Sequence, residues 1–240
     1  MMAQLEIRDL SGMAEFRLAE TLQNVVWGKD DTADPADLMM VMQAEGGLCA
    51  GAFQEGRLIG YVFGFPTKDP GVQHSHRLAV HPDARGMHLG SRLKWYQRDW
   101  CLARGIDHVR WTFDPLRGLN ASLNIGTLGV IVKTYYTDYY GDMQGINAGL
   151  PSDRLLADWH LKSAPVKARA AGLPAPNNGT VVLRLKLVEG SDAMILNDPA
   201  GALAERMRLR EAFTCALATG GAIIGFDRTT REYLIGPLTH

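Results

Sequence analysis

The segment from Val72 to Ala103 constrains the fold most, because it joins a predicted strand to a predicted helix through a short turn. Val72–Val80 follows the breaker Lys68-Asp69-Pro70-Gly71 and is predicted as a strand. Apolar side chains then recur three and four positions apart, as on one helical face: Leu89, Leu93, Tyr96, Trp100 and Ala103. Gly105 is placed to end this helix. A strand, turn and helix in this order predict an α/β unit.

Other apolar patterns extend this unit to about residue 162. Leu48–Phe53 and Leu58–Phe65 flank a turn with a glycine and are predicted as a hairpin. The further predicted elements are a strand through Leu5 and Ile7, a helix through Phe16, Ala19, Leu22 and Val26 that ends at Gly28, a helix over Ala36–Gln43, a strand through Val109, Trp111 and Phe113, a helix over Asn120–Leu128, and strands over Val130–Tyr136 and Arg154–Leu161. The order is β-α-α-β-β-β-α-β-α-β-β, which is typical of an α/β (α+β) fold.

The chain changes character from about Ser163. Prolines, asparagines and a glycine over residues 165–179 predict a linker, so we divide the chain into residues 1–162 and a C-terminal extension, 163–240. The extension is predicted to contain a strand over Thr180–Val188, a helix over Ala200–Ala218, and short strands over Ala222–Phe226 and Glu232–Ile235. The helix carries Leu203, Met207, Arg210 and Phe213, and we expect it to pack on the core or on another subunit.

Composition excludes several classes of protein. Lys and Arg (25) nearly balance Asp and Glu (26), so no global charge favours nucleic acid or a membrane surface. The start MMAQLEIRDL lacks the features of a signal peptide, and no apolar run approaches the ~20 residues that span a bilayer, so we expect a cytoplasmic protein. The three cysteines are far apart, which argues against a disulfide framework or a zinc site and favours buried apolar roles: Cys49, Cys101 and Cys215.

The turn between the central strand and helix offers a place for an anion. A helix start has backbone N–H groups without intrahelical partners, and the positive end of the helix dipole lies there. Gly86 and Gly90 would let a phosphate approach the backbone, and Arg85 adds a positive charge. The turn by itself fits a phosphate site or an ordinary helix start.

A longer pattern is more specific. Residues 78–93 read Leu-Ala-Val-x-Pro-x-x-Arg-Gly-x-x-x-Gly-x-x-Leu, which resembles the acetyl-CoA signature of the GNAT superfamily of N-acetyltransferases. The predicted element order also resembles that fold over about residues 3–162. Within the superfamily, the His-Ser-His-x-Leu-Ala-Val strand (His74–Val80) and the Trp-Thr-Phe-Asp-Pro-Leu strand end (Trp111–Leu116) are similar to those of a bacterial group of predicted acetyltransferases with a C-terminal extension.

The resemblance implies a central mixed, mostly antiparallel sheet flanked by helices, with a small C-terminal αβ extension. It implies acetyl-CoA as co-substrate and no metal. The backbone of Leu78, Ala79 and Val80 would pair with the pantetheine arm. The pyrophosphate would be bound by the following loop and helix start: Arg85, Gly86, Met87, His88, Leu89 and Gly90, with the Ser91 hydroxyl. Asn120 and Asn124 would contact the far side of the pantetheine arm.

Two residues depart from the superfamily pattern. His88 stands where the loop usually has its first glycine, and we expect it to adopt helical backbone angles without breaking the loop. Its side chain would crowd the phosphates or, if protonated, assist them. Ile125 falls near the position where many members carry a tyrosine that protonates the departing thiolate.

His74 and His76 are the candidate general bases. They are two residues apart on one strand, so we expect both to share a face with Leu78. His74 aligns with the glutamate base of several relatives, and histidine has a suitable pKa near 6.5. The pair could instead be structural, or could bind a metal, although no third ligand is indicated by spacing.

The tyrosines Tyr135, Tyr136, Tyr139 and Tyr140 could supply the missing acid or pack between the sheet and the extension. Asp114 could orient the amine, but a turn cap is the favoured role.

The sequence thus predicts direct transfer of an acetyl group from acetyl-CoA to a primary amine. The acceptor could be a small molecule or a peptide, and a homodimer is possible; no nucleic-acid or membrane partner is expected. A GNAT-like module that binds acyl-CoA without turnover is the alternative, followed by a scaffold role.

Overall fold

The computed structural model describes residues 5–29, 31–141 and 149–238. The chain forms two compact units, Met1–Val109 and Arg110–His240, which are described separately below. Within the described residues, none of the helices combines the length and the apolar character needed to cross a membrane.

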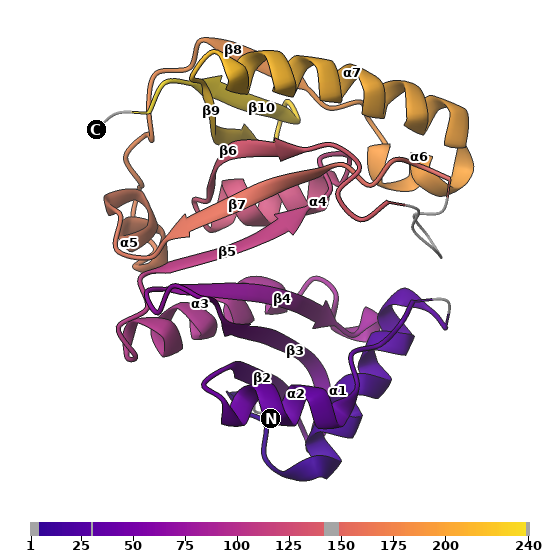
Figure 1. Cartoon of the computed structure of the whole chain (residues 1–240), viewed down its shortest axis with the longest axis vertical. Helices are drawn as coiled ribbons and strands as arrows, with labels where there is room; N and C mark the ends of the chain where they lie inside the picture. Colours follow the sequence, from indigo (N-terminus) through magenta and orange to yellow (C-terminus); the bar gives the residue numbers. More distant parts are fainter. Residues whose placement is uncertain (1–4, 30, 142–148, 239–240) are drawn as a thin grey trace. The chain divides into compact units, whose positions relative to one another are not determined.

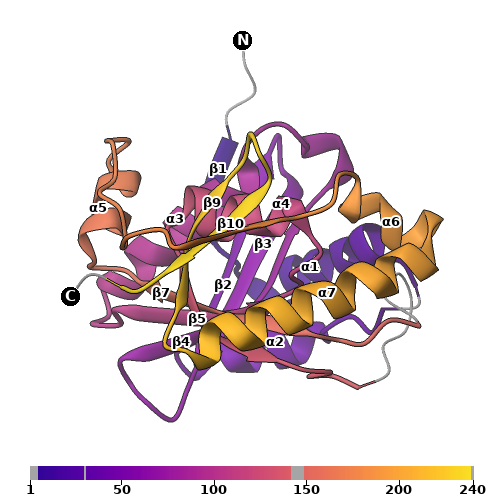
Figure 2. The ribbon, with the colours of Figure 1, turned by 90° about the horizontal axis from the view of Figure 1, so that it is seen from above.

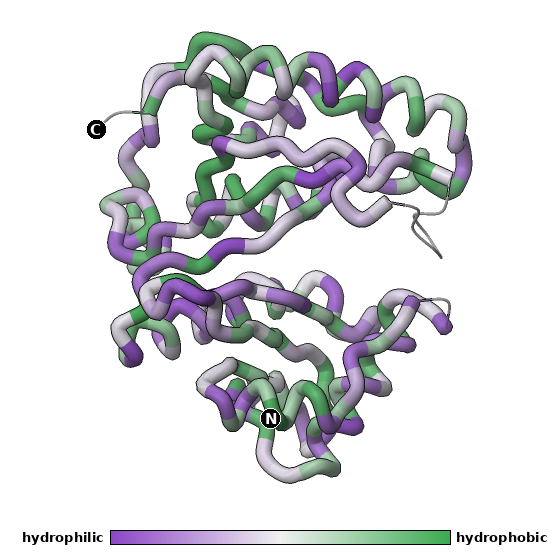
Figure 3. Tube along the Cα trace, in the orientation of Figure 1, coloured by the Kyte–Doolittle hydropathy of each residue, from purple (hydrophilic) through white to green (hydrophobic). Residues whose placement is uncertain are grey.

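The first unit is a four-stranded sheet with helices. Its elements are β1 (Leu5–Asp9), α1 (Gly12–Trp27), α2 (Ala36–Ala44), β2 (Leu48–Gln54), β3 (Arg57–Pro66), β4 (Val72–Val80), the 3₁₀ turn η1 (Pro82–Ala84) and α3 (Leu89–Leu102) (Figure 1). The strands are antiparallel in the order β1-β2-β3-β4. The predicted strand over Val72–Val80 is confirmed at the same residues. Strands β2 and β3 are buried along most of their length, and the tube of Figure 3 is correspondingly hydrophobic there.

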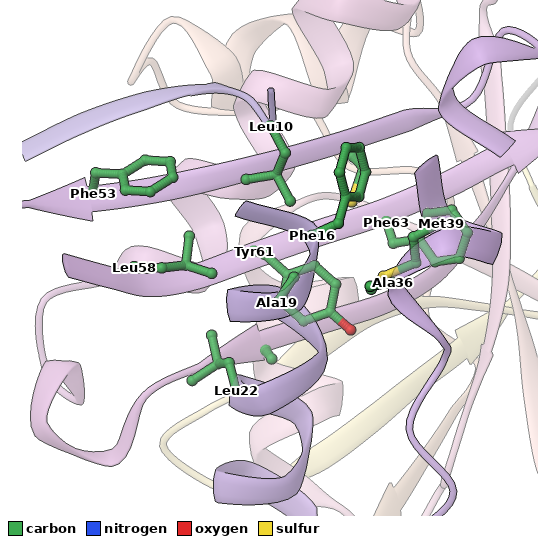
Figure 4. Close-up of a cluster of buried hydrophobic side chains, with 12 residues drawn as sticks. Leu10, Phe16, Ala19, Leu22, Ala36, Met39, Phe53, Leu58, Tyr61 and Phe63 are labelled. Carbon is green, nitrogen blue, oxygen red and sulfur yellow. The ribbon is translucent and has the colours of Figure 1, made fainter. Parts of the chain in front are cut away.

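The apolar face of α1 anchors one side of this sheet. Phe16, Ala19 and Leu22 recur at helical spacing and are buried, as predicted. They pack with Met39 of α2 and Tyr61 of β3, among other side chains, in the cluster of Figure 4. Gly28 ends α1 with a φ of 88°, which a glycine adopts without strain.

A β-bulge in β4 changes which side chains share a face. Phe63 pairs with Arg77, but the next residue, Gly64, pairs with Ser75, so His76 is an extra residue on β4. The strand's alternation reverses there. Figure 4 and the core cluster place Phe63 on the α1/α2 side of the sheet, which puts its cross-strand partner Arg77 on that side too.

The two histidines lie on this same side. His74 pairs with Phe65, and both histidine rings contact the Phe65 ring, with centroids 5.0 and 5.5 Å away. Leu78 follows Arg77 and therefore points to the opposite side. The prediction that His74 and His76 share a face is confirmed, but the prediction that Leu78 shares it is wrong, because the bulge was not visible in the sequence.

The second unit contains a mixed set of strands and helices. Its elements are β5 (His108–Phe113, which spans the division), α4 (Gly118–Ala121), the π-helix η2 (Ser122–Thr127), β6 (Ile131–Tyr136), β7 (Arg154–His160), α5 (Ala164–Ala170), β8 (Leu183–Lys186), α6 (Ser191–Asn197), α7 (Pro199–Ala218), β9 (Ala222–Asp227) and β10 (Glu232–Gly236). Five strands follow the order β7-β6-β9-β10-β8. The pairs β6–β7, β6–β9, β9–β10 and β8–β10 are antiparallel. Together the two units have a mixed α/β fold with mostly antiparallel strands flanked by helices.

The tail differs from its predicted form. Helices α5 and α6 were not predicted, and α5 occupies part of the predicted linker, with Pro165 in its first turn, where a missing N–H costs no hydrogen bond. The compact units divide between Val109 and Arg110, whereas the sequence suggested a division after residue 162. Residues beyond 162 share a unit with β6 because Ile223 of β9 pairs with Val132 of β6.

Helix α7 is a long helix that contacts β6 of its unit (Figures 1 and 2). The predicted apolar stripe is wrong in part: Leu203 and Met207 are exposed, whereas the buried residues are Ala202, Glu205, Arg206, Leu209 and Phe213. Ion pairs explain the difference. Arg206 forms two bonds to Asp114, of 2.6 and 2.9 Å, and Arg210 forms two to Asp153. Polar contacts therefore select the inward face.

The cysteine prediction holds for two of three residues. Cys49 and Cys101 are buried, but Cys215 on α7 is exposed, because it lies outside the inward face of that helix.

Candidate functional site

The loop from Val80 to Leu89 presents backbone donors on the surface of the first unit. Strand β4 ends at Val80, the turn η1 follows, and α3 begins at Leu89. The side chain of His81 accepts a hydrogen bond from the N–H of Asp83 at 3.2 Å, and Arg57 at the start of β3 forms a 3.2 Å salt bridge with Asp83. These contacts fix the first half of the loop to the sheet.

The second half of the loop is open to solvent. Arg85, Gly86, Met87 and His88 are exposed, and the first N–H that bonds back into α3 is that of Arg92, to the His88 carbonyl. Among the described residues, the N–H groups of Gly86, His88, Leu89, Gly90 and Ser91 have no hydrogen-bond acceptor. Five free donors, the positive end of a 14-residue helix and an exposed arginine together favour an anion at this point.

His88 does not have the helical conformation that we predicted. Its φ and ψ are 53° and 25°, in the left-handed region that a glycine would occupy without strain. Histidine is among the residues that tolerate this region, at a cost of about 1–2 kcal/mol. The loop therefore keeps the glycine-type geometry in spite of the substitution. The Ser91 hydroxyl donates to the His88 carbonyl at 2.7 Å, so it supports the turn.

Leu78, Ala79 and Val80 pair with Val62, Tyr61 and Gly60 of β3. In an antiparallel pair, alternate backbone groups of each strand point away from the partner strand, so part of the backbone of Leu78, Ala79 and Val80 points away from β3.

A charged cluster lies on the α1/α2 side of the bulge. His76 Nε2 is 3.2 Å from Asp34 Oδ1, and Arg77 Nε is 3.1 Å from Asp34 Oδ2. Arg77 also binds Asp31 at 2.6 Å and lies 4.7 Å from the ring centroid of Trp27 at the end of α1.

The surroundings keep Asp34 ionised and leave His76 accessible. Burial raises the pKa of Asp34, but the hydrogen bond and charge of His76 and the charge of Arg77 together hold it below its usual value. The Asp34 side chain is 15% exposed and that of His76 is 38% exposed. His74 lies beside this pair, with its ring centroid 6.0 Å from that of His76. A carboxylate bound to one imidazole nitrogen orients the ring and stabilises its protonated form.

A second polar cluster lies on the opposite side of β4, under α3. Lys94 is 2% exposed, and its ammonium donates to Ser75 Oγ at 2.9 Å and Gln97 Oε1 at 2.7 Å. Gln97 in turn donates to Gln73 Oε1 at 2.7 Å. Burial lowers the pKa of Lys94 to about 7. A side chain at Gly64 would collide with both glutamines, at 2.8 and 3.0 Å, so glycine makes room for this cluster.

Sequence reasoning missed Asp31, Asp34, Arg77 and Lys94. The loop after Gly28 is rich in aspartate, but nothing in the sequence placed it against β4. The sequence did hint at a buried polar partner for Lys94, because the small polar residue Ser75 lies between two histidines. Its side chain is buried on the same side of β4 as that of Gln73.

The remaining predicted residues belong to the second unit. Asn120 is exposed on α4, and Asn124 is buried in η2, where its carbonyl accepts from Val130. Their role as pantetheine contacts stays a prediction. Ile125, at the position of the tyrosine acid, is 1% exposed. Asp114 accepts from the Leu116 N–H at 2.8 Å, so the favoured role as a turn cap is confirmed.

The four tyrosines differ in their surroundings, and Tyr135 packs against the extension. Tyr135 donates to Asp153 at 2.5 Å, and its ring centroid lies 5.9 Å from that of Phe213 on α7. The Tyr139 ring lies 4.7 Å from the Tyr136 ring, at an interplanar angle of 30°, and 4.7 Å from the Tyr140 ring, which it meets edge to face. Tyr139 and Tyr140 are exposed. Throughout residues 5–29, 31–141 and 149–238, His, Cys, Asp and Glu side chains form no group of three or more that could hold a metal ion.

These features define a mixed α/β unit in which a loop with free backbone N–H groups follows β4. Residues 13–119 match the model of the Acetyltransferase (GNAT) family. This segment of the chain is therefore similar to GNAT acetyltransferases. No curated protein matches the sequence significantly.

Solved structures confirm the fold. The Escherichia coli ribosomal-protein-S18-alanine N-acetyltransferase is 16% identical with a TM-score of 0.55, and the match covers 67% of this chain and 96% of that one. Aminoglycoside 6'-acetyltransferase type Ii is 16% identical with a TM-score of 0.54, covering 67% and 99%. An aminoglycoside 6'-N-acetyltransferase complexed with coenzyme A is 13% identical with a TM-score of 0.53, covering 67% and 99%.

Proposed function

We propose that this protein transfers an acetyl group from acetyl-CoA to a primary amine. The observation that carries the proposal is the set of free N–H groups at Gly86 and at residues 88–91, which follow the strand that also bears the His76–Asp34 pair. The similar proteins named above are N-acetyltransferases, and one of them was solved with coenzyme A.

The loop would bind the pyrophosphate of acetyl-CoA. The free N–H groups of Gly86 and of residues 88–91 would donate to phosphate oxygens, and Arg85 would add charge. The outward backbone groups of residues 78–80 would pair with the pantetheine amides as an added strand.

His76 is the better candidate for the general base. Both histidines were predicted, but the structure gives His76 a carboxylate partner, the accessible side chain and the bulged position on β4. The amine nitrogen would attack the thioester carbonyl carbon while the free ring nitrogen of His76 takes the amine proton, directly or through water. The carbon–sulfur bond then breaks and coenzyme A leaves as a thiolate. A β4 backbone N–H near the bulge would stabilise the carbonyl oxygen during attack.

Binding and turnover are tested separately. Titration of acetyl-CoA by calorimetry should show weaker binding for Arg85→Ala and much weaker binding for Gly86→Pro, because proline removes a donor and fixes φ near −65°, whereas Gly86 has a φ of 85°. Arg17→Ala, at an exposed position on α1, is the matched control. Unchanged affinity in both loop variants would refute the cofactor site.

The alternative function is acyl-CoA binding without turnover, which the buried Ile125 in place of a tyrosine acid favours. Thiol release from acetyl-CoA over a panel of small-molecule and peptide amines separates the two. Release with at least one amine supports the enzyme, whereas binding without release supports the module. The acceptor, a possible homodimer and the compartment stay predictions.

A further inference from the structure

Two arginines meet over one short segment of the second unit. Arg228 follows β9, and Arg169 lies on α5. An added Cβ at Gly126 would lie 3.0 Å from Arg228 Nε, and one at Gly129 would lie 3.1 Å from Arg169 Nη1. The two glycines are three residues apart at the end of η2, so both guanidinium groups lie against the same backbone segment.

Neither charge is neutralised by an acidic side chain. Within the part of the chain that the structure describes, Arg169 and Arg228 form no salt bridge. Arg228 donates to the carbonyl of Ser122 and to the hydroxyl of Thr127. Arg169 makes one long contact, 3.5 Å from Nη1 to the carbonyl of Pro165, although it is half-buried. Burial, and then the charge of Arg228, lower the pKa of Arg169. Two like charges are thus held together with most of their donors unused.

A cavity opens beside Arg169. Its volume is about 490 Å³, and its lining includes Gly129 and Pro165, the two residues that contact the Arg169 guanidinium. Lys133 adds a positive charge to the wall, and Asn177 adds an amide. Asp158 brings an acidic group and His160 an imidazole to the same lining. The two arginines lie outside it, next to Gly126 and Gly129. A cavity of this size holds a small organic molecule.

We propose that this cavity is a second ligand site, for a small molecule that carries a phosphate group. Arg169 and Arg228 bind the phosphate oxygens, and the rest of the molecule enters the cavity past Gly129. Two guanidinium groups match the charge of a phosphate monoester, which is about −1.5 to −2 near neutral pH. The site is built from η2, α5 and the β9–β10 turn, so it is independent of the loop after β4.

The alternative is that the arginines only stabilise the end of η2, whose carbonyl groups carry partial negative charge. That role predicts a loss of stability on substitution but no ligand. The proposal predicts in addition that a molecule with a phosphate group binds to the two arginines.

The test uses the full chain with inorganic phosphate and phenyl phosphate as probes, measured by calorimetry and by the rise in Tm. Arg169→Met should weaken binding of both probes by about tenfold or more, since it removes a charged pair of donors. Arg184→Met, at a surface salt bridge on β8, should leave binding unchanged. Arg228→Met repeats the test from the other side, and the circular dichroism spectrum of each unliganded variant checks that it is folded.

Phosphate could also occupy the loop at residues 85–91, so Arg85→Ala is measured in parallel. Binding that survives in Arg85→Ala and is lost in Arg169→Met supports the second site. Binding that is lost only in Arg85→Ala, or equal affinity in wild type and Arg169→Met, overturns it. Neither outcome depends on whether the protein transfers acetyl groups.

Discussion

Lys94→Met should change how the stability of this protein depends on pH. In the folded protein the pKa of Lys94 is about 7, because the ammonium is buried with Ser75 and Gln97 as its neighbours, whereas its ordinary value is 10.5. The difference of about 3.5 corresponds to a cost of about 5 kcal/mol for holding the charged form in the fold, at about 1.36 kcal/mol per unit.

The sign follows from proton binding. Below pH 7 both the folded and the unfolded chain hold the Lys94 proton, so the full cost is present. Between pH 7 and about 10.4 the unfolded chain still holds the proton and the folded chain does not, so stability rises with pH. The wild type should therefore gain about 4 kcal/mol relative to Lys94→Met between pH 7 and pH 10.

Urea denaturation of both proteins at pH 7, 8.5 and 10 measures this difference. Subtracting the unfolding free energy of one protein from that of the other at each pH removes the contribution of groups that titrate in both. Cys101 faces the ammonium, and burial raises its pKa to about 12, so the thiol stays neutral over most of this range. Lys68→Met, at an exposed position, is the control and should show no such trend. Parallel pH profiles for wild type and Lys94→Met would refute the reasoning.

Three further substitutions test other parts of the structure. His76→Ala should lower kcat by roughly 10²-fold with little change in acetyl-CoA affinity, and Asp34→Asn by less; equal kcat in His76→Ala and wild type would exclude the base. Arg206→Met should lower the free energy of unfolding by about 3–5 kcal/mol because it leaves Asp114 buried and unpaired, and adding Asp114→Asn should restore part of the loss in urea denaturation. His88→Gly should raise the unfolding free energy by up to about 1 kcal/mol by removing left-handed strain, and a clear loss of stability would contradict the assigned backbone geometry.

The sequence predicted the parts of the fold that depend on local patterns. The strand Val72–Val80, the helix beginning at Leu89 and the hairpin turn at Glu55-Gly56 follow from periodicity and turn residues, and both turn residues have positive φ. The family resemblance likewise rested on local patterns, above all on residues 78–93, and it was supported by the match over residues 13–119.

The features that the sequence did not show depend on contacts between distant residues. The inward face of α7 is set by Arg206 and Asp114, which are 92 positions apart. The spacing of apolar residues along the helix therefore predicted the wrong buried face in part. His76 meets Asp34 across 42 positions. The buried position of Lys94 follows from polar partners on β4, which local hydrophobicity does not report.

The bulge in β4 has a consequence for how one carboxylate is used. In a regular strand, neighbouring side chains point to opposite sides of the sheet, so a single group on one side reaches every second residue. The extra residue lets His76 and Arg77, which are adjacent in sequence, both reach Asp34. Deleting one residue here would restore a regular ladder. Asp34 would then reach either the titratable His76 or the permanently charged Arg77, but not both.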